Sequence, residues 1–282
     1  TPVPTTARDF TVAGTQIGDV DAHAFQSAAS CAACHGGYDL EMAPHAGWSG
    51  SLMAQGGRDP LFFAQMATAN QDVAGAGYFC LRCHVPMSIV TGHALPADGS
   101  ALDATDREGV TCHFCHAMVD PIYTPGVSPP QDAAILGGLA EVPTEYGNAM
   151  FVLDPTGTRR GPYDAPLAAH GWIRSPFHRR SELCGTCHDV GNLQVSRQPD
   201  GTYLYNALDA PSPSQDPWQQ FPLERTYTEW TLSAFASGGV DLGGRFGGPG
   251  STEVSTCQDC HMPPTTGVGC YFGEERADLP RH

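Results

Sequence analysis

The chain has 282 residues, with 30 acidic residues against 14 basic ones and a formal net charge of −16. All the basic residues are Arg, and a surface of this charge repels phosphate backbones, which argues against a nucleic-acid partner. Such a charge favours solubility, or docking to a positively charged protein. The 33 Gly and 24 Pro stay below the level of disordered chains, so we expect a globular, loop-rich fold.

Local signals outside the cysteine-rich segments predict a few regular elements. The first is a helix over residues 59–70, where Asp59 can cap the first turn and Pro60 suits the first helical position. Further along, residues 193–197 and 202–206 flank a Pro-Asp-Gly turn and predict a small β-hairpin.

The C-terminal part of the chain predicts one more helix and one long loop. Residues 222–236 begin with Pro and end before Gly238 and Gly239, which is the pattern of a helix with its stop signal. The glycine-rich residues 243–250 predict a loop, which would be able to lie against a flat ligand.

Five copies of the pentapeptide C-x-x-C-H dominate the sequence, whereas composition alone predicts far less than one copy. We number them motifs 1 to 5 in chain order: Cys31-Ala-Ala-Cys34-His35, Cys80-Leu-Arg-Cys83-His84, Cys112-His-Phe-Cys115-His116, Cys184-Gly-Thr-Cys187-His188 and Cys257-Gln-Asp-Cys260-His261. This spacing is the signature of covalent c-type haem attachment, in which two thiols bond the porphyrin and the adjacent imidazole binds iron. The sequence therefore predicts five haem c groups, and we expect a short helical turn at each motif.

Other interpretations of paired cysteines explain the pattern less well. Structural zinc also uses C-x-x-C pairs, but it gives no reason for a histidine directly after every second cysteine. A disulfide framework favours scattered spacings, and a thioredoxin-like redox pair explains one motif rather than five.

Five porphyrins would supply much of the apolar interior, so regular secondary structure should be sparse. The expected fold class is mainly α with extensive loops, built around a haem-packed core with little regular secondary structure and one small β-hairpin. We expect one pentahaem domain over residues 1–282, with a sub-division into a three-haem part (1–120) and a two-haem part (121–282).

The axial ligands of the irons follow from the histidine count. The motif histidines are the expected proximal ligands, namely His35, His84, His116, His188 and His261. Seven imidazoles remain for the opposite side of five irons: His23, His45, His93, His113, His170, His178 and His282. This supply favours mostly bis-histidine, six-coordinate irons, which are closed to substrate and suit electron transfer. His113 lies inside motif 3 and would reach only a neighbouring haem.

Several sequence stretches resemble the haem-bearing part of large secreted multihaem cytochromes c, over nearly the whole chain. They are Gly37-Tyr38-Asp39, WSGSLM with RDP, EGVTCHFCH, SPFHRRSELCGTCHDV, ERTYTEW, STCQDCHM and DLPRH. The resemblance implies distal-ligand positions at His178, His170 and His282. Met53 falls where such cytochromes often have a histidine, which implies a His/Met haem. His23, His45 and His93 are distal candidates that the resemblance does not include.

The chain opens at Thr1 without a charged-then-apolar leader, and we interpret it as a mature form whose export signal is removed. Because bacterial c-type haems are attached outside the cytoplasmic membrane, we expect a periplasmic or extracellular protein. No apolar run approaches the roughly 18 residues of a membrane span. The eleventh cysteine, Cys270, belongs to no motif and reads as a buried thiol, an intermolecular link or a haem-adjacent ligand.

Two classes of function remain at this stage. The favoured one is a non-enzymatic electron conduit that serves other redox proteins or cytochromes, or further copies of itself in a filament. The alternative is a multihaem oxidoreductase acting on a small nitrogen or sulfur compound at one open haem. Pentahaem nitrite reductases use Lys as one proximal ligand, and this chain has no Lys. Five arginines, Arg159, Arg160, Arg174, Arg179 and Arg180, are candidates to pair with haem propionates.

Overall fold

The computed structural model describes residues 2–164 and 168–282. It is a mixed fold, with 33% of residues helical and 15% in strands that form several small sheets. The expected fold class, mainly α with a haem-packed core, is therefore wrong. The physical reason is that the chain's own side chains fill an apolar interior, and short strand pairs satisfy the backbone groups of the connecting segments.

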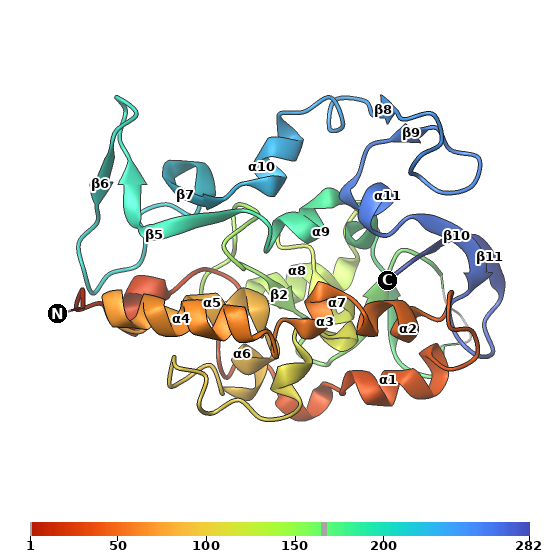
Figure 1. The fold of residues 1–282 in the computed structure, drawn as a ribbon, viewed down its shortest axis with the longest axis horizontal. Coiled ribbons are helices and arrows are strands. Elements are labelled where there is room, and N and C mark those ends of the chain that lie inside the picture. Colours follow the sequence, from red (N-terminus) through yellow and green to blue (C-terminus); the bar gives the residue numbers. More distant parts are fainter. Residues whose placement is uncertain (1, 165–167) are drawn as a thin grey trace.

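Helices in the described part of the chain are short, and most are concentrated in the N-terminal half (Figure 1). The α-helices are α1 (Ala28–His35), α2 (Pro44–Ser49), α3 (Leu52–Gln55), α4 (Pro60–Asp72), α5 (Gly77–His84), α6 (Met87–Thr91), α7 (Cys112–Ala117), α8 (Pro130–Gly137), α9 (Ser181–Gly185), α10 (Thr226–Thr231) and α11 (Cys257–His261). Single 3-10 turns are η1 (Ala7–Phe10), η2 (Ala22–Ala24), η3 (Asp106–Glu108), η4 (Pro176–Arg179) and η5 (Pro217–Gln219).

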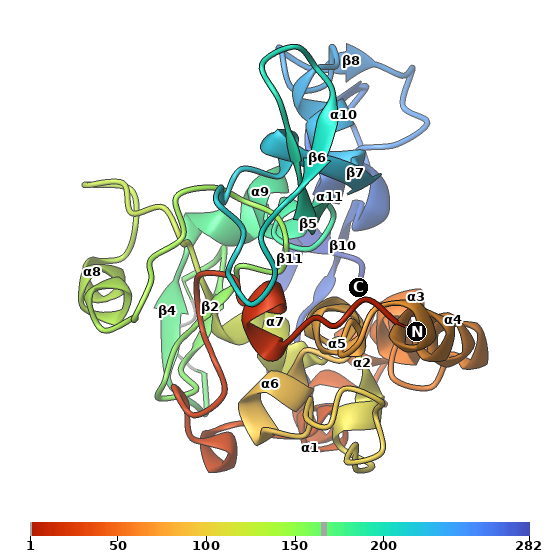
Figure 2. The same ribbon diagram turned by 90° about the vertical axis from the view of Figure 1, so that its left-hand side faces the viewer.

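Strands pair in small separate sheets rather than in one layer. They are β1 (Met118–Val119), β2 (Val152–Leu153), β3 (Arg159–Gly161), β4 (Trp172–Arg174), β5 (Val190–Arg197), β6 (Tyr203–Tyr205), β7 (Gln220–Glu224), β8 (Val240–Asp241), β9 (Glu253–Val254), β10 (Pro264–Val268) and β11 (Glu275–Pro280). Strands β3 and β4 pair in parallel, whereas β6, β5 and β7 form a three-stranded antiparallel sheet. The β5–β6 hairpin projects from the body in both views (Figures 1 and 2).

Motifs 1, 2, 3 and 5 lie on short helices, as expected, whereas α9 ends at Gly185 inside motif 4, so that Cys187 and His188 follow outside the helix. In motifs 3 and 5 a threonine directly before the first cysteine caps that helix: Thr111 accepts from the amide of Phe114, and Thr256 accepts from the amide of Asp259. Ser27 does the same for α1 by accepting from the amide of Ser30. Local sequence thus places the following histidine at the end of α1 and α11.

The predicted elements outside the motifs have mixed outcomes. Helix α4 confirms the prediction over residues 59–70, with Asp59 accepting from the amide of Leu61. The hairpin is confirmed by the pairing of Val195 with Tyr205, and residues 243–250 form the loop between β8 and β9. The helix over residues 222–236 is wrong. Strand β7 occupies its first part because it pairs with β5, and α10 covers only Thr226–Thr231.

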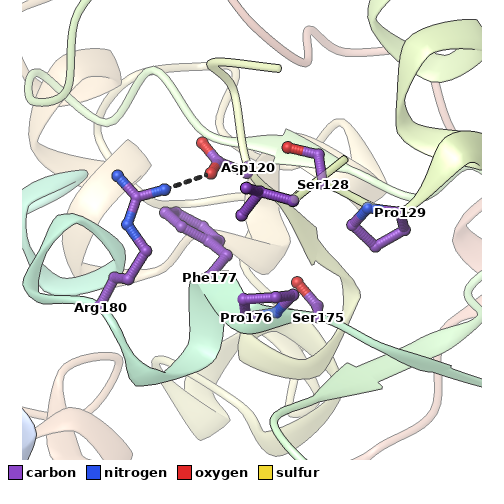
Figure 3. A pocket seen from close by; sticks show the side chains of 8 residues that line it. Asp120, Ser128, Pro129, Ser175, Pro176, Phe177 and Arg180 are labelled. Atoms are coloured by element: carbon purple, nitrogen blue, oxygen red, sulfur yellow. Dashed lines mark hydrogen bonds and ion pairs between the residues drawn. The ribbon is translucent and has the colours of Figure 1, made fainter. Parts of the chain in front are cut away.

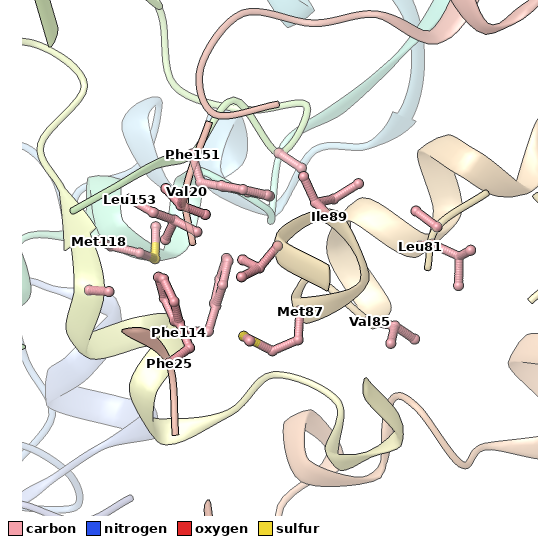
Figure 4. Packing of buried hydrophobic residues seen from close by; sticks show 14 of the residues in the cluster. Val20, Phe25, Leu81, Val85, Met87, Ile89, Phe114, Met118, Phe151 and Leu153 are labelled. Carbon is pink, nitrogen blue, oxygen red and sulfur yellow. The ribbon is translucent and has the colours of Figure 1, made fainter. Parts of the chain in front are cut away.

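The main hydrophobic core gathers side chains from the first two thirds of the chain (Figure 4). Leu81 from motif 2 and Phe114 from motif 3 are fully buried in it, and Phe151 packs edge-on against Phe114. Residues between the two cysteines therefore anchor these two motifs to the interior. No helix among the described residues combines the length and hydrophobicity needed to cross a membrane.

Candidate metal centre

The ten motif cysteines are all free thiols, of which Cys34 is an exposed residue and the other nine are partly exposed residues. Because no disulfide engages them within the described residues, each motif keeps both sulfur atoms for covalent attachment. Among the motif histidines, His35 and His116 are half-buried, whereas His84, His188 and His261 are exposed.

Motifs 1 and 3 lie side by side, and so do motifs 4 and 5. Helix α1 packs against α7, and the amide of Gln26 donates to Nδ1 of His113 at 2.8 Å. Helix α11 packs against α9, where the amide of Cys257 donates to Oγ of Ser181 at 3.0 Å. The thiols also meet: Cys112 lowers the pKa of Cys31 to about 7, and Cys184 lowers the pKa of Cys257 to about 6.

Motif 4 also contacts motifs 2 and 3. The backbone of Ala149 connects motifs 2 and 4, since its carbonyl accepts from Arg82 at 3.0 Å and its amide donates to Thr186 at 2.8 Å. A close contact with the Cys187 thiol, together with burial, raises the pKa of Cys83. His178, just before α9, bonds through Nε2 to the carbonyl of Cys115 at 3.0 Å. Motif 4 is therefore where three other motifs meet.

Five histidines from four segments of the chain gather beside motifs 1 and 3. We call this set the imidazole cluster: His35, His116, His170, His178 and His282. The ring centres of His35 and His170 are 6.3 Å apart, those of His116 and His178 are 5.7 Å apart, and those of His116 and His282 are 6.0 Å apart. The indole of Trp172 lies between them, 6.3 Å from His116 and 6.2 Å from His170.

Backbone carbonyls fix the proton on both motif histidines of the cluster. Nδ1 of His35 lies 2.7 Å from the carbonyl of Gly269, and Nδ1 of His116 lies 2.6 Å from the carbonyl of Arg160. A carbonyl only accepts, so each Nδ1 carries the proton and each Nε2 keeps its lone pair. That is the orientation of a metal-ligating histidine.

The cluster fits a metal held between two imidazoles. Two imidazoles that bind one metal ion from opposite sides, each with a bond of about 2 Å, have ring centres roughly 6 Å apart. Burial lowers the pKa of His178 to about 3 and that of His282 to about 4, so both rings stay neutral and able to bind. Nδ1 of His178 is buried and has no hydrogen-bond partner. Imidazole donors suit iron, and the adjacent thiols suit covalent attachment of its porphyrin.

A buried ion triad supports the His116 side of the cluster. Arg160, whose carbonyl holds His116, is fully buried and donates to Asp132 at 2.6 Å and to Asp154 at 2.7 Å. The other arginines of this segment also find partners within the chain, since Arg180 pairs with Asp120 and Arg179 with Asp278. Four of the five arginines expected to pair with propionates thus pair with carboxylates of the protein.

The surroundings of motif 2 differ from those of motifs 1 and 3. The ring of Phe62 stacks on His84 at 4.1 Å, and burial lowers the pKa of His84 while His188 lowers it further by repulsion. Helix α3, which carries Met53, ends beside this motif, since a Cβ on Gly56 would come within 2.7 Å of the His84 carbonyl. The Met53 side chain is 46% exposed. The structure thus brings the segment of Met53 to His84, whereas none of the spare imidazoles of the described residues makes a ring contact with it.

The remaining distal candidates lie elsewhere. His23 is exposed on η2, and His45 packs against Trp48 with ring centres 5.5 Å apart. His93 bonds through Nδ1 to the buried Asp106 at 2.6 Å. None of these three makes a ring contact with a motif histidine within the described ranges, and neither does the exposed His261 of motif 5 with a spare imidazole.

The structure also shows the surroundings of His113 and Cys270. His113 is buried with both ring nitrogens bonded, Nδ1 to the amide of Gln26 and Nε2 to the carbonyl of Gly157, so it is a structural residue. Cys270 is partly exposed and lies beside motif 1, because the next residue, Tyr271, donates its amide to the carbonyl of Cys34 at 2.7 Å.

Hollows in the described structure lie away from the motifs. A narrow pocket beside η4, too tight to admit a water molecule, is lined by residues that include Asp120 and Phe177, with Arg180 directed at Asp120 (Figure 3). A larger open hollow of about 530 Å³ is lined mostly by apolar residues such as Ile122 and Leu136. Neither contains a motif cysteine or histidine.

Sequence reasoning missed Trp172, Phe62 and Arg82. Trp172 and Phe62 are brought to histidines by contacts between distant segments, and their immediate sequence gives no sign of it. The sequence did contain a sign of the role of Arg82, because it lies between two motif cysteines. A charged residue at that position must either reach solvent or be buried together with its motif. Comparison with protein-family models, with curated proteins and with solved structures finds no match to this chain.

Proposed function

We propose that this protein is an electron-transfer protein that carries five covalently bound haem c groups, one at each motif. The observation that carries the proposal is the imidazole cluster, in which Nδ1 of His35 and of His116 is bonded to a carbonyl, Nε2 keeps its lone pair, and other imidazole rings lie at a spacing suited to one metal ion. When bound, the haem iron supplies one-electron chemistry between its ferric and ferrous states.

The residues of the chain have three roles in this proposal. The ten motif thiols attach the porphyrins, and the five motif histidines are the proximal ligands. The second ligands would be His170 for the His35 side and either His178 or His282 for the His116 side, because these rings lie nearest to the motif histidines. Filling both axial positions closes an iron to substrate, which favours a conduit over a catalyst.

The proposed setting is the periplasm or the cell exterior, with other redox proteins or cytochromes as partners. A further proposed partner is a second copy of the chain in an oligomer or filament. The net charge of −16 supports docking to positively charged surfaces and gives no support to nucleic-acid binding.

Mass spectrometry of the denatured protein tests the proposal directly. We expect five haem additions, and alkylation should label one thiol, Cys270, out of eleven cysteines. Three or fewer haem additions would contradict the assignment. Ten or more labelled thiols after reduction, with no haem mass, would instead indicate disulfides or a bound metal.

A further inference from the structure

Arg82 is a fully buried cation without a carboxylate partner among the described residues. Its side chain is 0% exposed, and Nε and Nη1 make no hydrogen bond. Nη2 donates to two backbone carbonyls, those of Thr15 at 3.1 Å and Ala149 at 3.0 Å, and the guanidinium lies 4.7 Å from the ring centre of Phe151. Carbonyls and a ring stabilise the charge only in part, so it remains able to act on its surroundings.

The contrast with Arg160 shows that this arrangement is particular to Arg82. Both guanidinium groups are fully buried, but Arg160 is neutralised by Asp132 and Asp154. The structure therefore pairs one buried arginine with two carboxylates and leaves the other as a net positive charge.

Arg82 lies at the junction of motifs 2 and 4. It stands directly before Cys83, and its charge interacts with the thiols of Cys83 and Cys187 as well as with the hydroxyl of Tyr78. The carboxylate that acts on Cys83 belongs to Glu224, and among the described residues it is not in an ion pair with Arg82. A guanidinium keeps its proton in proteins, so this positive charge is permanent.

We propose that Arg82 is a buried electrostatic residue that favours electron uptake at motifs 2 and 4 over the other three motifs. This rests on the proposed function, because it requires a haem at both motifs. Each reduction adds one electron to a ferric group, and the added negative charge is attracted by a nearby cation in a low-dielectric interior. The guanidinium itself exchanges no proton and forms no bond.

The test is a redox titration with dithionite as the one-electron reductant, on the full protein and three variants. Arg82→Gln removes the charge and should lower two of the five midpoint potentials while three stay in place. Arg82→Lys keeps the charge and should restore both midpoints. Arg245→Gln, at an exposed arginine, is the matched control and should leave all five unchanged. Equal shifts in the Gln and Lys variants, or no shift in either, would overturn the proposal.

The same question can be asked of the unmodified protein, in case Arg82→Gln does not fold. Haem methyl resonances assigned by NMR give each midpoint separately, and we expect the two highest at motifs 2 and 4. Any other order would overturn the proposal. Mass spectrometry of the same samples distinguishes failure of the proposed function from failure of the role of Arg82. Absence of haem refutes the proposed function, whereas five haems with the wrong potentials refute only the role of Arg82.

Discussion

The imidazole cluster and the junction of motifs 2 and 4 use opposite means of shaping a redox site. In the cluster, charges are neutralised, as Arg160 meets two carboxylates and His178 and His282 are held neutral by burial. At the junction, Arg82 keeps its charge. The nearby His84 is exposed, and the ring of Phe62 stacks on one of its faces.

This difference teaches that similar motifs need not give equivalent sites. The pentapeptide supplies two thiols and one imidazole everywhere, but the residues between the cysteines and the segments packed on them decide burial and charge. Leu81 and Arg82 take motif 2 into the core, whereas the corresponding Ala32 and Ala33 leave motif 1 at the surface. The predictions below test each side of this comparison.

The largest effect is expected from Asp132→Ala, which removes one partner of Arg160. Arg160 keeps Asp154 as its partner, so the variant loses one buried, charge-assisted hydrogen bond, which contributes about 1.5–3 kcal/mol. We expect that loss in the free energy of unfolding measured in urea. Asp164→Ala is the control, because its ion pair with Arg174 is exposed and should contribute at most about 1 kcal/mol. Equal effects of the two variants would contradict the neutralised-cluster description.

His178→Ala tests the ligands within the cluster. The variant should convert one iron from low-spin to high-spin, because the imidazole stacked on His116 is gone. Electron paramagnetic resonance measures the change, with His45→Ala as the control that makes no such contact. An unchanged spectrum in His178→Ala would show that His282 is the ligand opposite His116, and His282→Ala should then produce the high-spin signal.

Phe62→Ala tests the junction side. Aromatic stacking contributes about 0.5–1.5 kcal/mol beyond the buried area, and here the partner is His84. We expect a stability loss of about that size and a change in the signals of a single haem. Leu61→Ala, at a side chain 75% exposed, should change neither stability nor spectrum. A change in several haem signals would mean that Phe62 supports more than motif 2.

His23→Ala should have the smallest effect. The side chain is exposed and near no motif histidine, so the free energy of unfolding should change by less than about 0.5 kcal/mol. The low-spin signals should also persist. If His23 instead completes an iron in a second copy, the variant will show a high-spin component, and light scattering will report a smaller particle than the parent protein.

The sequence predicted features that depend on neighbours along the chain. Helix α4 follows from Asp59 and Pro60, and the β5–β6 hairpin follows from its turn. The expected helix over residues 222–236 is wrong because Gln220–Glu224 pairs with β5, a contact between segments that local propensity does not contain. The distal positions of His170, His178 and His282 came from the resemblance, and their partners appear only when distant segments meet.

Ala149 bonds to both motif 2 and motif 4, so the order in which the chain is made affects when motif 2 is complete. Asn148 and Ala149 both have positive φ, an uncommon conformation held here by the bonds of Asn148 to Gln220 and Gly191. Because the chain is synthesised from its N-terminus, motif 2 is made well before this turn. Until residues 148 and 149 are added, Arg82 lacks one of its two carbonyl acceptors, so motif 2 acquires its final surroundings only when the segment leading to motif 4 has been made.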